Sequence, residues 1–189
     1  VDEREKIATY TGPTLATVWY QTFPKGNRFL MENVREALGK LGGGGRAHRL
    51  EIHLPEPLLR QYDIGVVPCY ILWGSEQLRD RIDIQPEEFY RRLTSDPVHP
   101  TTAQPTPRDF LRAYEAARQT GAREIVVICV SSAMSGTIES ARQAATMIDL
   151  PIHIVDSKGP TMSLGWQVLA AARARAAGGD AQAMIAAAD

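Results

Sequence analysis

The stretch that decides the fold is residues 125–148, which read IVVICVSSAMSGTIESARQAATMI. Its first six residues are apolar without a break and rich in β-branched side chains, as is typical of a strand buried on both faces of a parallel sheet. A loop of small polar residues follows over 131–136, and apolar side chains then recur at helical spacing, at Ile138, Ala141, Ala144, Ala145 and Ile148. The stretch therefore predicts a strand, a loop at its carboxyl end and a helix. Open α/β sheets bind ligands at such loops.

The loop before this helix has the chemistry of an anion-binding site. The first backbone N–H groups of a helix have no partner within the helix, and together with the helix dipole they favour negative charge. Gly136 leaves room for a ligand to approach the backbone, and hydroxyls are offered by Ser131, Ser132, Ser135 and Thr137. A purely structural interpretation is also open, in which Ser135 only caps the helix and Gly136 only makes the turn.

The segments around this stretch continue the alternation of strand and helix. Residues 106–109 (TPRD) are typical of a helix start, with a capping threonine followed by proline at the first helical position. Residues 151–156 predict another strand and residues 161–177 a long Ala-rich helix, after which Asp180 is expected to cap a further helix. Continuous apolar strands that alternate with helices predict an α/β fold, a parallel sheet with helices on both faces.

The chain between residues 55 and 106 also predicts regular elements. These are a short helix over 55–62, an apolar strand over 64–73, a charged loop over 75–84 and a helix over 86–93. Pro68 interrupts the strand, which favours an edge position or a bulge. Residues 101–106 predict a hydroxyl-rich loop that could reach the same edge of the sheet as residues 131–136. No general base, carboxylate pair or metal-ligand set joins these hydroxyls, so the pattern indicates binding of an anionic head group more than catalysis.

Composition narrows the function further. The net charge of −1 over 189 residues gives no indication of binding to nucleic acid or to an acidic membrane surface. No apolar run approaches the roughly 20 residues of a membrane span. Cys69 and Cys129 lie within apolar runs, and the four histidines lack metal-ligand spacing. We therefore expect a cytoplasmic protein with buried free cysteines and with no metal or cofactor.

From about residue 54 the sequence resembles the DegV family of bacterial fatty-acid-binding proteins. The resemblance is carried, in the family's order, by LPEPLLRQYDIGVVP (54–68), RDRIDIQPEEFYRRL (79–93), PTTAQPTPRDFLRAY (100–114), SSAMSGTIESAR (131–142) and VDSKGPTMSLG (155–165). It implies a two-domain α/β protein with a long-chain fatty acid between the domains. It also implies that the carboxylate is held by the TTxQP hydroxyl and by the Ser-Gly of the SGT loop, which by motif are Thr102, Ser135 and Gly136. Some family members present the acyl chain to a fatty acid kinase subunit for phosphorylation, without a catalytic residue of their own.

The sequence departs from the family pattern at three places. Ala103 stands where the family has the serine of TTSQP, and Arg81 stands where the family has the glycine of RDG. The Asp-Ser-Thr motif that the family carries just before Leu54 is absent, and residues 48–53 read HRLEIH.

These departures lead to an expected domain organisation. Residues 1–53 are expected to be an atypical segment with a Gly-rich linker at 42–45, residues 54–160 the DegV-like lipid-binding domain, and residues 161–189 the start of the connection to a second domain that is largely missing. A shifted reading frame is one explanation for the first segment, since the codons of residues 48–50, read one base over, can encode Thr-Asp-Ser. Residues 10–50 are then expected to pack poorly or to lie as an extension, although residues 15–20 also suit a strand and residues 29–41 a helix.

Two other functions stay open from the sequence. Ser135 could be the nucleophile of a serine hydrolase, but AMSGT differs from G-x-S-x-G and no histidine is placed to pair with it. The same helix N-terminus could instead bind phosphate or a phosphosugar, without an apolar site for an acyl chain.

Overall fold

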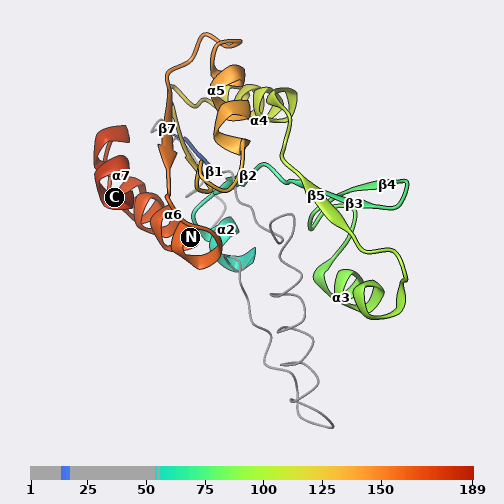
Figure 1. Cartoon of the computed structure of the whole chain (residues 1–189). Helices are drawn as coiled ribbons and strands as arrows, with labels where there is room; N and C mark the ends of the chain where they lie inside the picture. The colour runs from blue at the N-terminus through green and yellow to red at the C-terminus, as the bar shows by residue number, and fades with distance from the viewer. Residues whose placement is uncertain (1–13, 18–53, 55) are drawn as a thin grey trace, which may run out of the picture.

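A parallel sheet forms the centre of the chain (Figure 1). The structure is a computed structural model and describes residues 14–17, 54 and 56–189. In this part of the chain the sheet has the order β2 (Gly65–Val66), β1 (Thr14–Thr17), β6 (Ile125–Cys129) and β7 (Ile152–Asp156), with all neighbours parallel. Every residue of β6 is buried, as expected for a strand covered on both faces. The predicted α/β fold with a parallel sheet is confirmed.

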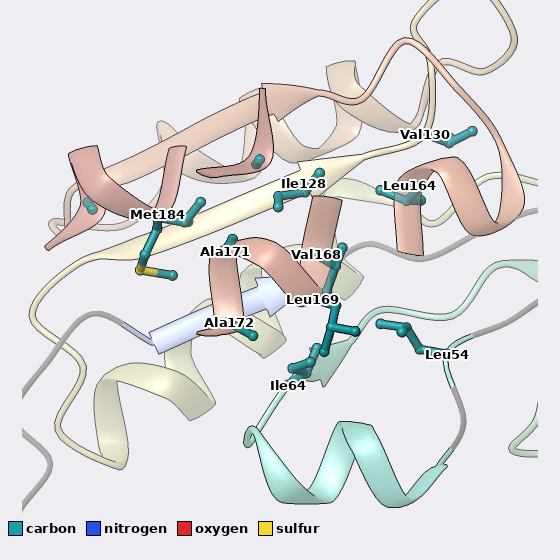
Figure 2. Close-up of a cluster of buried hydrophobic side chains, with 13 residues drawn as sticks. Leu54, Ile64, Ile128, Val130, Leu164, Val168, Leu169, Ala171, Ala172 and Met184 are labelled. Carbon is teal, nitrogen blue, oxygen red and sulfur yellow. The ribbon is translucent and has the colours of Figure 1, made fainter. Parts of the chain in front are cut away.

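Helices cover both faces of this sheet (Figure 1). On one face, α4 (Pro107–Gln119) and α5 (Thr137–Ala145) enclose a core that contains Ile125, Val127 and Cys129. On the other face, α2 (Glu56–Gln61), α6 (Thr161–Ala176) and α7 (Ala181–Ala188) enclose Val126 and Ile128. Figure 2 shows this second core, in which side chains of α6 and Met184 of α7 surround Ile128. The alternation of β6 residues between the two cores follows from the two-residue period of a strand.

The predicted helix signals are present in the structure. The side chain of Thr106 accepts the N–H of Asp109, and the carboxylate of Asp109 accepts the N–H of Thr106, which makes a full capping box at the start of α4. Asp180 caps α7 by accepting the N–H of Ala183 at 2.9 Å. Cys69 and Cys129 are buried thiols, as predicted.

A second sheet, which sequence reasoning did not predict, lies beside the first (Figure 1). It is antiparallel, with β3 (Tyr70–Trp73) between β4 (Glu76–Arg79) and β5 (Thr101–Ala103). The helix α3 (Pro86–Ser95) packs on it around a small core of Ile71, Trp73, Ile84 and Phe89.

This sheet corrects three predictions. Residues 64–73 are not one interrupted strand, because β2 pairs in the parallel sheet and β3 pairs in the antiparallel one, with Pro68 between them. Proline has no N–H to donate to a neighbouring strand, so the chain changes sheets there. Residues 75–84 are not all loop, since β4 forms a hairpin with β3 through Gly74, whose φ of +61° suits glycine. Residues 101–106 are not all loop either, because β5 pairs with β3.

The first segment of the chain contributes to the parallel sheet. Thr14–Thr17 lies between β2 and β6, so the expectation of poor packing over residues 10–50 is wrong for these four residues. They overlap the strand suggested over 15–20. The helix suggested over 29–41, the glycine run and the proposed frame shift all fall outside the described residues.

The helix α6 is buried on one side only. Leu164, Val168 and Leu169 contact the core, whereas the side chain of Trp166 is 61% exposed. No helix in the described part of the chain is long and apolar enough to cross a membrane.

Candidate functional site

Two loops meet at the carboxyl edge of the parallel sheet. One runs from β6 to α5 over residues 131–136, and the other runs from β7 to α6 over residues 157–160. The N–H of Ser131 donates to the carbonyl of Gly159 at 3.3 Å, and the N–H of Ser157 donates to the carbonyl of Cys129 at 3.0 Å. The two loops therefore support each other at the edge where the sequence predicts a ligand site.

Asp156, the last residue of β7, holds the first of these loops. Its carboxylate accepts the hydroxyl of Ser132 at 2.5 Å and the N–H of Lys158 at 2.9 Å. Partial burial raises the pKa of Asp156, but hydrogen bonds from Ser132 and Lys158 outweigh it and hold the pKa below its ordinary value. The Asp156 carboxylate therefore forms hydrogen bonds with residues of both loops.

The start of α5 keeps two free backbone donors. The hydroxyl of Ser135 lies 2.8 Å from that of Thr137 and accepts the N–H of Thr137 at 3.3 Å. The N–H groups of Gly136 and Ile138 have no hydrogen-bond partner within the described residues. Ser135 therefore caps one N–H of the helix, as the structural interpretation predicts, and the N–H groups of Gly136 and Ile138 stay available as donors.

The third predicted residue, Thr102, lies on β5 in the antiparallel sheet, opposite Ile71, and is half-buried. The TTAQP motif, to which Thr102 belongs, contacts the SGT segment through Gln104, two residues after Thr102. The side-chain amide of Gln104 donates to the hydroxyl of Ser140 at 3.4 Å and lies against Gly136. The structure thus joins the two motifs through Gln104. Sequence reasoning missed this residue, although the TTxQP motif itself contains it.

Arg81, one of the departures from the family pattern, lies in a turn with φ of +60°. This left-handed conformation is easy for glycine and costly for other residues. The Nε of Arg81 is buried without a partner in the part of the chain that the structure describes. The family's glycine therefore suits this backbone better than the arginine does.

A serine hydrolase would need a histidine beside Ser135. No histidine is hydrogen-bonded to Ser135 among the described residues, and His153 pairs with Glu124 at 2.9 Å. His153 is the second residue of β7, so it lies toward the opposite edge of the sheet from Ser135. The described residues also contain no group of three His, Cys, Asp or Glu side chains that could hold a metal ion.

Comparison with known proteins identifies relatives along most of the chain. A DegV domain-containing protein of Mycobacterium tuberculosis is 36% identical over 126 residues, which cover 66% of this chain and 43% of that protein. A DegV domain-containing protein of Staphylococcus aureus is 34% identical over 121 residues, or 63% of this chain and 42% of that protein. The chain spans less than half the length of these curated relatives.

Solved structures show the same architecture. A Thermus thermophilus protein, described as a DegV family protein with fatty acid binding, superposes with a TM-score of 0.65 at 29% identity, over 73% of this chain and 49% of that one. DegV of Bacillus subtilis, described as a fatty acid binding protein, gives a TM-score of 0.66 at 25% identity over the same shares. The match to about half of each chain corresponds to one α/β domain. Because the sequence model of the family described as "Uncharacterised protein, DegV family" also matches residues 51–189, the chain belongs to the DegV family.

Proposed function

We propose that this chain binds the carboxylate of a long-chain fatty acid at Thr102, Ser135 and Gly136. The observation that carries the proposal is the start of α5, where the N–H groups of Gly136 and Ile138 have no partner among the described residues. A helix N-terminus with free donors favours an anion. The two relatives described as fatty acid binding support the choice of a carboxylate as that anion.

Estimated binding free energies indicate different roles for the carboxylate and the acyl chain of the ligand. A helix N-terminus stabilises an anion by roughly 0.3–2 kcal/mol, and each hydrogen bond to a charged group contributes about 1.5–3 kcal/mol. Burial of an acyl chain contributes about 0.8 kcal/mol per CH₂, so on the order of 10 kcal/mol for a long chain. The head-group site therefore fixes the orientation of the ligand, while the tail supplies most of the affinity.

In this proposal the protein has no catalytic residue and acts as a carrier. It holds the fatty acid and presents the carboxylate to a fatty acid kinase subunit, which phosphorylates it in the cytoplasm. The support is the site's chemistry, since hydroxyls and backbone N–H groups bind a carboxylate without changing it, and the motifs that the chain shares with the DegV family over residues 100–114 and 131–142.

The test uses a ligand with a short tail, so that the head-group site is measured on its own. Octanoate is titrated into the ¹⁵N-labelled chain, and octan-1-ol and inorganic phosphate serve as comparison ligands. We expect octanoate to shift the N–H signals of Gly136 and Ile138 downfield and octan-1-ol to leave them in place, because only the acid carries the charge. Equal shifts from acid and alcohol, no shift with octanoate, or tighter binding of phosphate would contradict the proposal.

A variant pair locates the site. Ser135→Ala should weaken octanoate binding, whereas Ser95→Ala, at the end of α3, should not. Within the described residues the hydroxyl of Ser95 bonds the carbonyl of Arg91 on the same helix. Equal effects of the two substitutions would place the carboxylate elsewhere.

A further inference from the structure

The contact between Gln104 and Gly136 joins two loops that are distant in sequence. A Cβ atom added at Gly136 would lie 2.6 Å from Oε1 of Gln104, closer than real Cβ atoms approach other atoms, and 3.0 Å from Nε2, which is a tight contact. The same carboxamide donates to Ser140, which is 4% exposed in the first turns of α5. One side chain from the connection between β5 and α4 therefore lies directly over the start of α5.

The backbone of Gly136 does not by itself require glycine. Its φ of −75° and ψ of 10° are accessible to residues with a side chain. A side chain at residue 136 would instead meet the carboxamide of Gln104, which would have to move aside. The sequence alone favours a different reason, namely that glycine leaves room for the ligand.

We infer that Gln104 is a positioning residue for the carboxylate site and that residue 136 is glycine to accommodate Gln104. The carboxamide, held against Gly136 and Ser140, sets the distance between the strand end that carries Thr102 and the free N–H groups of Gly136 and Ile138. This inference rests on the proposed function for the identity of the ligand. The contact of Gln104 with Gly136 and Ser140 involves protein atoms only, so it can be measured separately.

The experiment is a double-mutant cycle with Gly136→Ala, Gln104→Ala and the double variant. The first readout is the side-chain NH₂ signal of Gln104 in the ligand-free protein, and the second is the affinity for octanoate. We expect Gly136→Ala to displace the carboxamide, so that its signal moves to the position of a free glutamine. Each single substitution should weaken octanoate binding roughly two- to tenfold, the equivalent of one neutral hydrogen bond.

The double variant decides between the two reasons for glycine. If Gln104 is the reason, the alanine Cβ fits the vacated space, and the double variant binds octanoate as well as Gln104→Ala does. If the ligand is the reason, the two effects multiply, and the inference is overturned. Gln104→Asn provides a second background, because its carboxamide is one CH₂ too short to cover residue 136, so Gly136→Ala should be tolerated there as well. Gln143→Ala is the control, an exposed glutamine on α5.

A wrong proposed function would give a different experimental result from a wrong role for Gln104. If octanoate does not bind the unsubstituted chain, the carboxylate site is wrong, whatever Gln104 does. The cycle is then completed by urea unfolding of the same four proteins. Additive changes in unfolding free energy would overturn the positioning role. Non-additive changes, with the displaced NH₂ signal, would retain it for whichever ligand the N–H groups of Gly136 and Ile138 receive.

Discussion

The hydroxyl of Tyr70 donates to the carboxylate of Asp109 and lies 3.0 Å from each of its oxygens. Tyr70 belongs to β3 and Asp109 to the first turn of α4, so this contact ties the antiparallel sheet to the helix that follows Thr102 and Gln104. The same carboxylate completes the capping box of α4. The placement of the TTAQP segment therefore depends on a hydrogen bond from another strand.

Tyr70→Phe should lower the free energy of unfolding by about 1–2 kcal/mol, because it removes one hydrogen bond to a charged and largely buried group. The loss stays at the lower end of that range because Thr106 and Arg112 still bond Asp109. Urea unfolding measures the change. Tyr90→Phe is the control, since Tyr90 is exposed and its hydroxyl forms no hydrogen bond within the described residues, and an equal loss in the two variants would contradict the prediction.

The stability conferred by Asp109 should depend on pH. Burial raises its pKa, but hydrogen bonds from Thr106, Tyr70 and Arg112 outweigh this and lower the pKa below its ordinary value. A carboxyl group whose pKa is lower in the folded state stabilises above its unfolded pKa, about 3.9, and loses that contribution as the pH falls through the folded value. Asp109→Asn should therefore flatten the decline of stability below about pH 4 relative to the parent protein. Parallel declines in the parent protein and Asp109→Asn would exclude this role.

Arg81→Gly should stabilise the protein by about 0.5–1 kcal/mol. Glycine removes the cost of a left-handed backbone, which outweighs its larger entropy in the unfolded chain. It also removes the buried Nε of Arg81 that has no partner among the described residues. Arg118→Gly, in the last turn of α4, should instead destabilise by about 1 kcal/mol because glycine is a poor helix former. Thermal unfolding of both variants measures whether the stability changes have opposite signs. A destabilised Arg81→Gly variant would refute the argument.

Arg175→Met should cost about 2–3 kcal/mol of stability. The guanidinium of Arg175 is 8% exposed and donates to the carbonyls of Tyr62 and Asp63, just after α2. Without it these carbonyls lose a charged donor in a partly buried place. Arg173→Met on the same helix is exposed and should change stability by less than about 0.5 kcal/mol. Similar unfolding midpoints for the two variants would show that the buried contact contributes little.

Thr102→Ala and Ser135→Ala together should weaken fatty acid binding more than either alone. If the proposed site is right, each substitution removes one hydrogen bond to the carboxylate, worth about 1.5–3 kcal/mol, and the effects are coupled because the two hydroxyls then share a ligand. Titration calorimetry with octanoate measures all three variants. Unchanged binding by the double variant would place the carboxylate elsewhere.

Local sequence determined the unit of β6, its following loop and α5, together with the polar groups of that loop. The apolar run of β6 could only be buried on both faces, and the small polar residues after it could only make a turn into α5, so Ser135 and Gly136 were placed at a helix start from sequence. The caps at Thr106 and Asp180 were likewise visible because each side chain bonds the N–H three residues further along.

Tertiary structure alone decided how distant segments pair. The sequence pattern of residues 64–73 is equally apolar throughout, yet β2 and β3 entered different sheets, and the charged segment of β4 gave no sign of a strand. Thr14–Thr17 pairs between β2 and β6, which follow it by many residues. Strand pairing uses backbone N–H and C=O groups, which every residue other than proline carries in full, so side-chain patterns do not specify the partner. For the same reason the contact of Gln104 with Gly136 became visible only when the chain was folded.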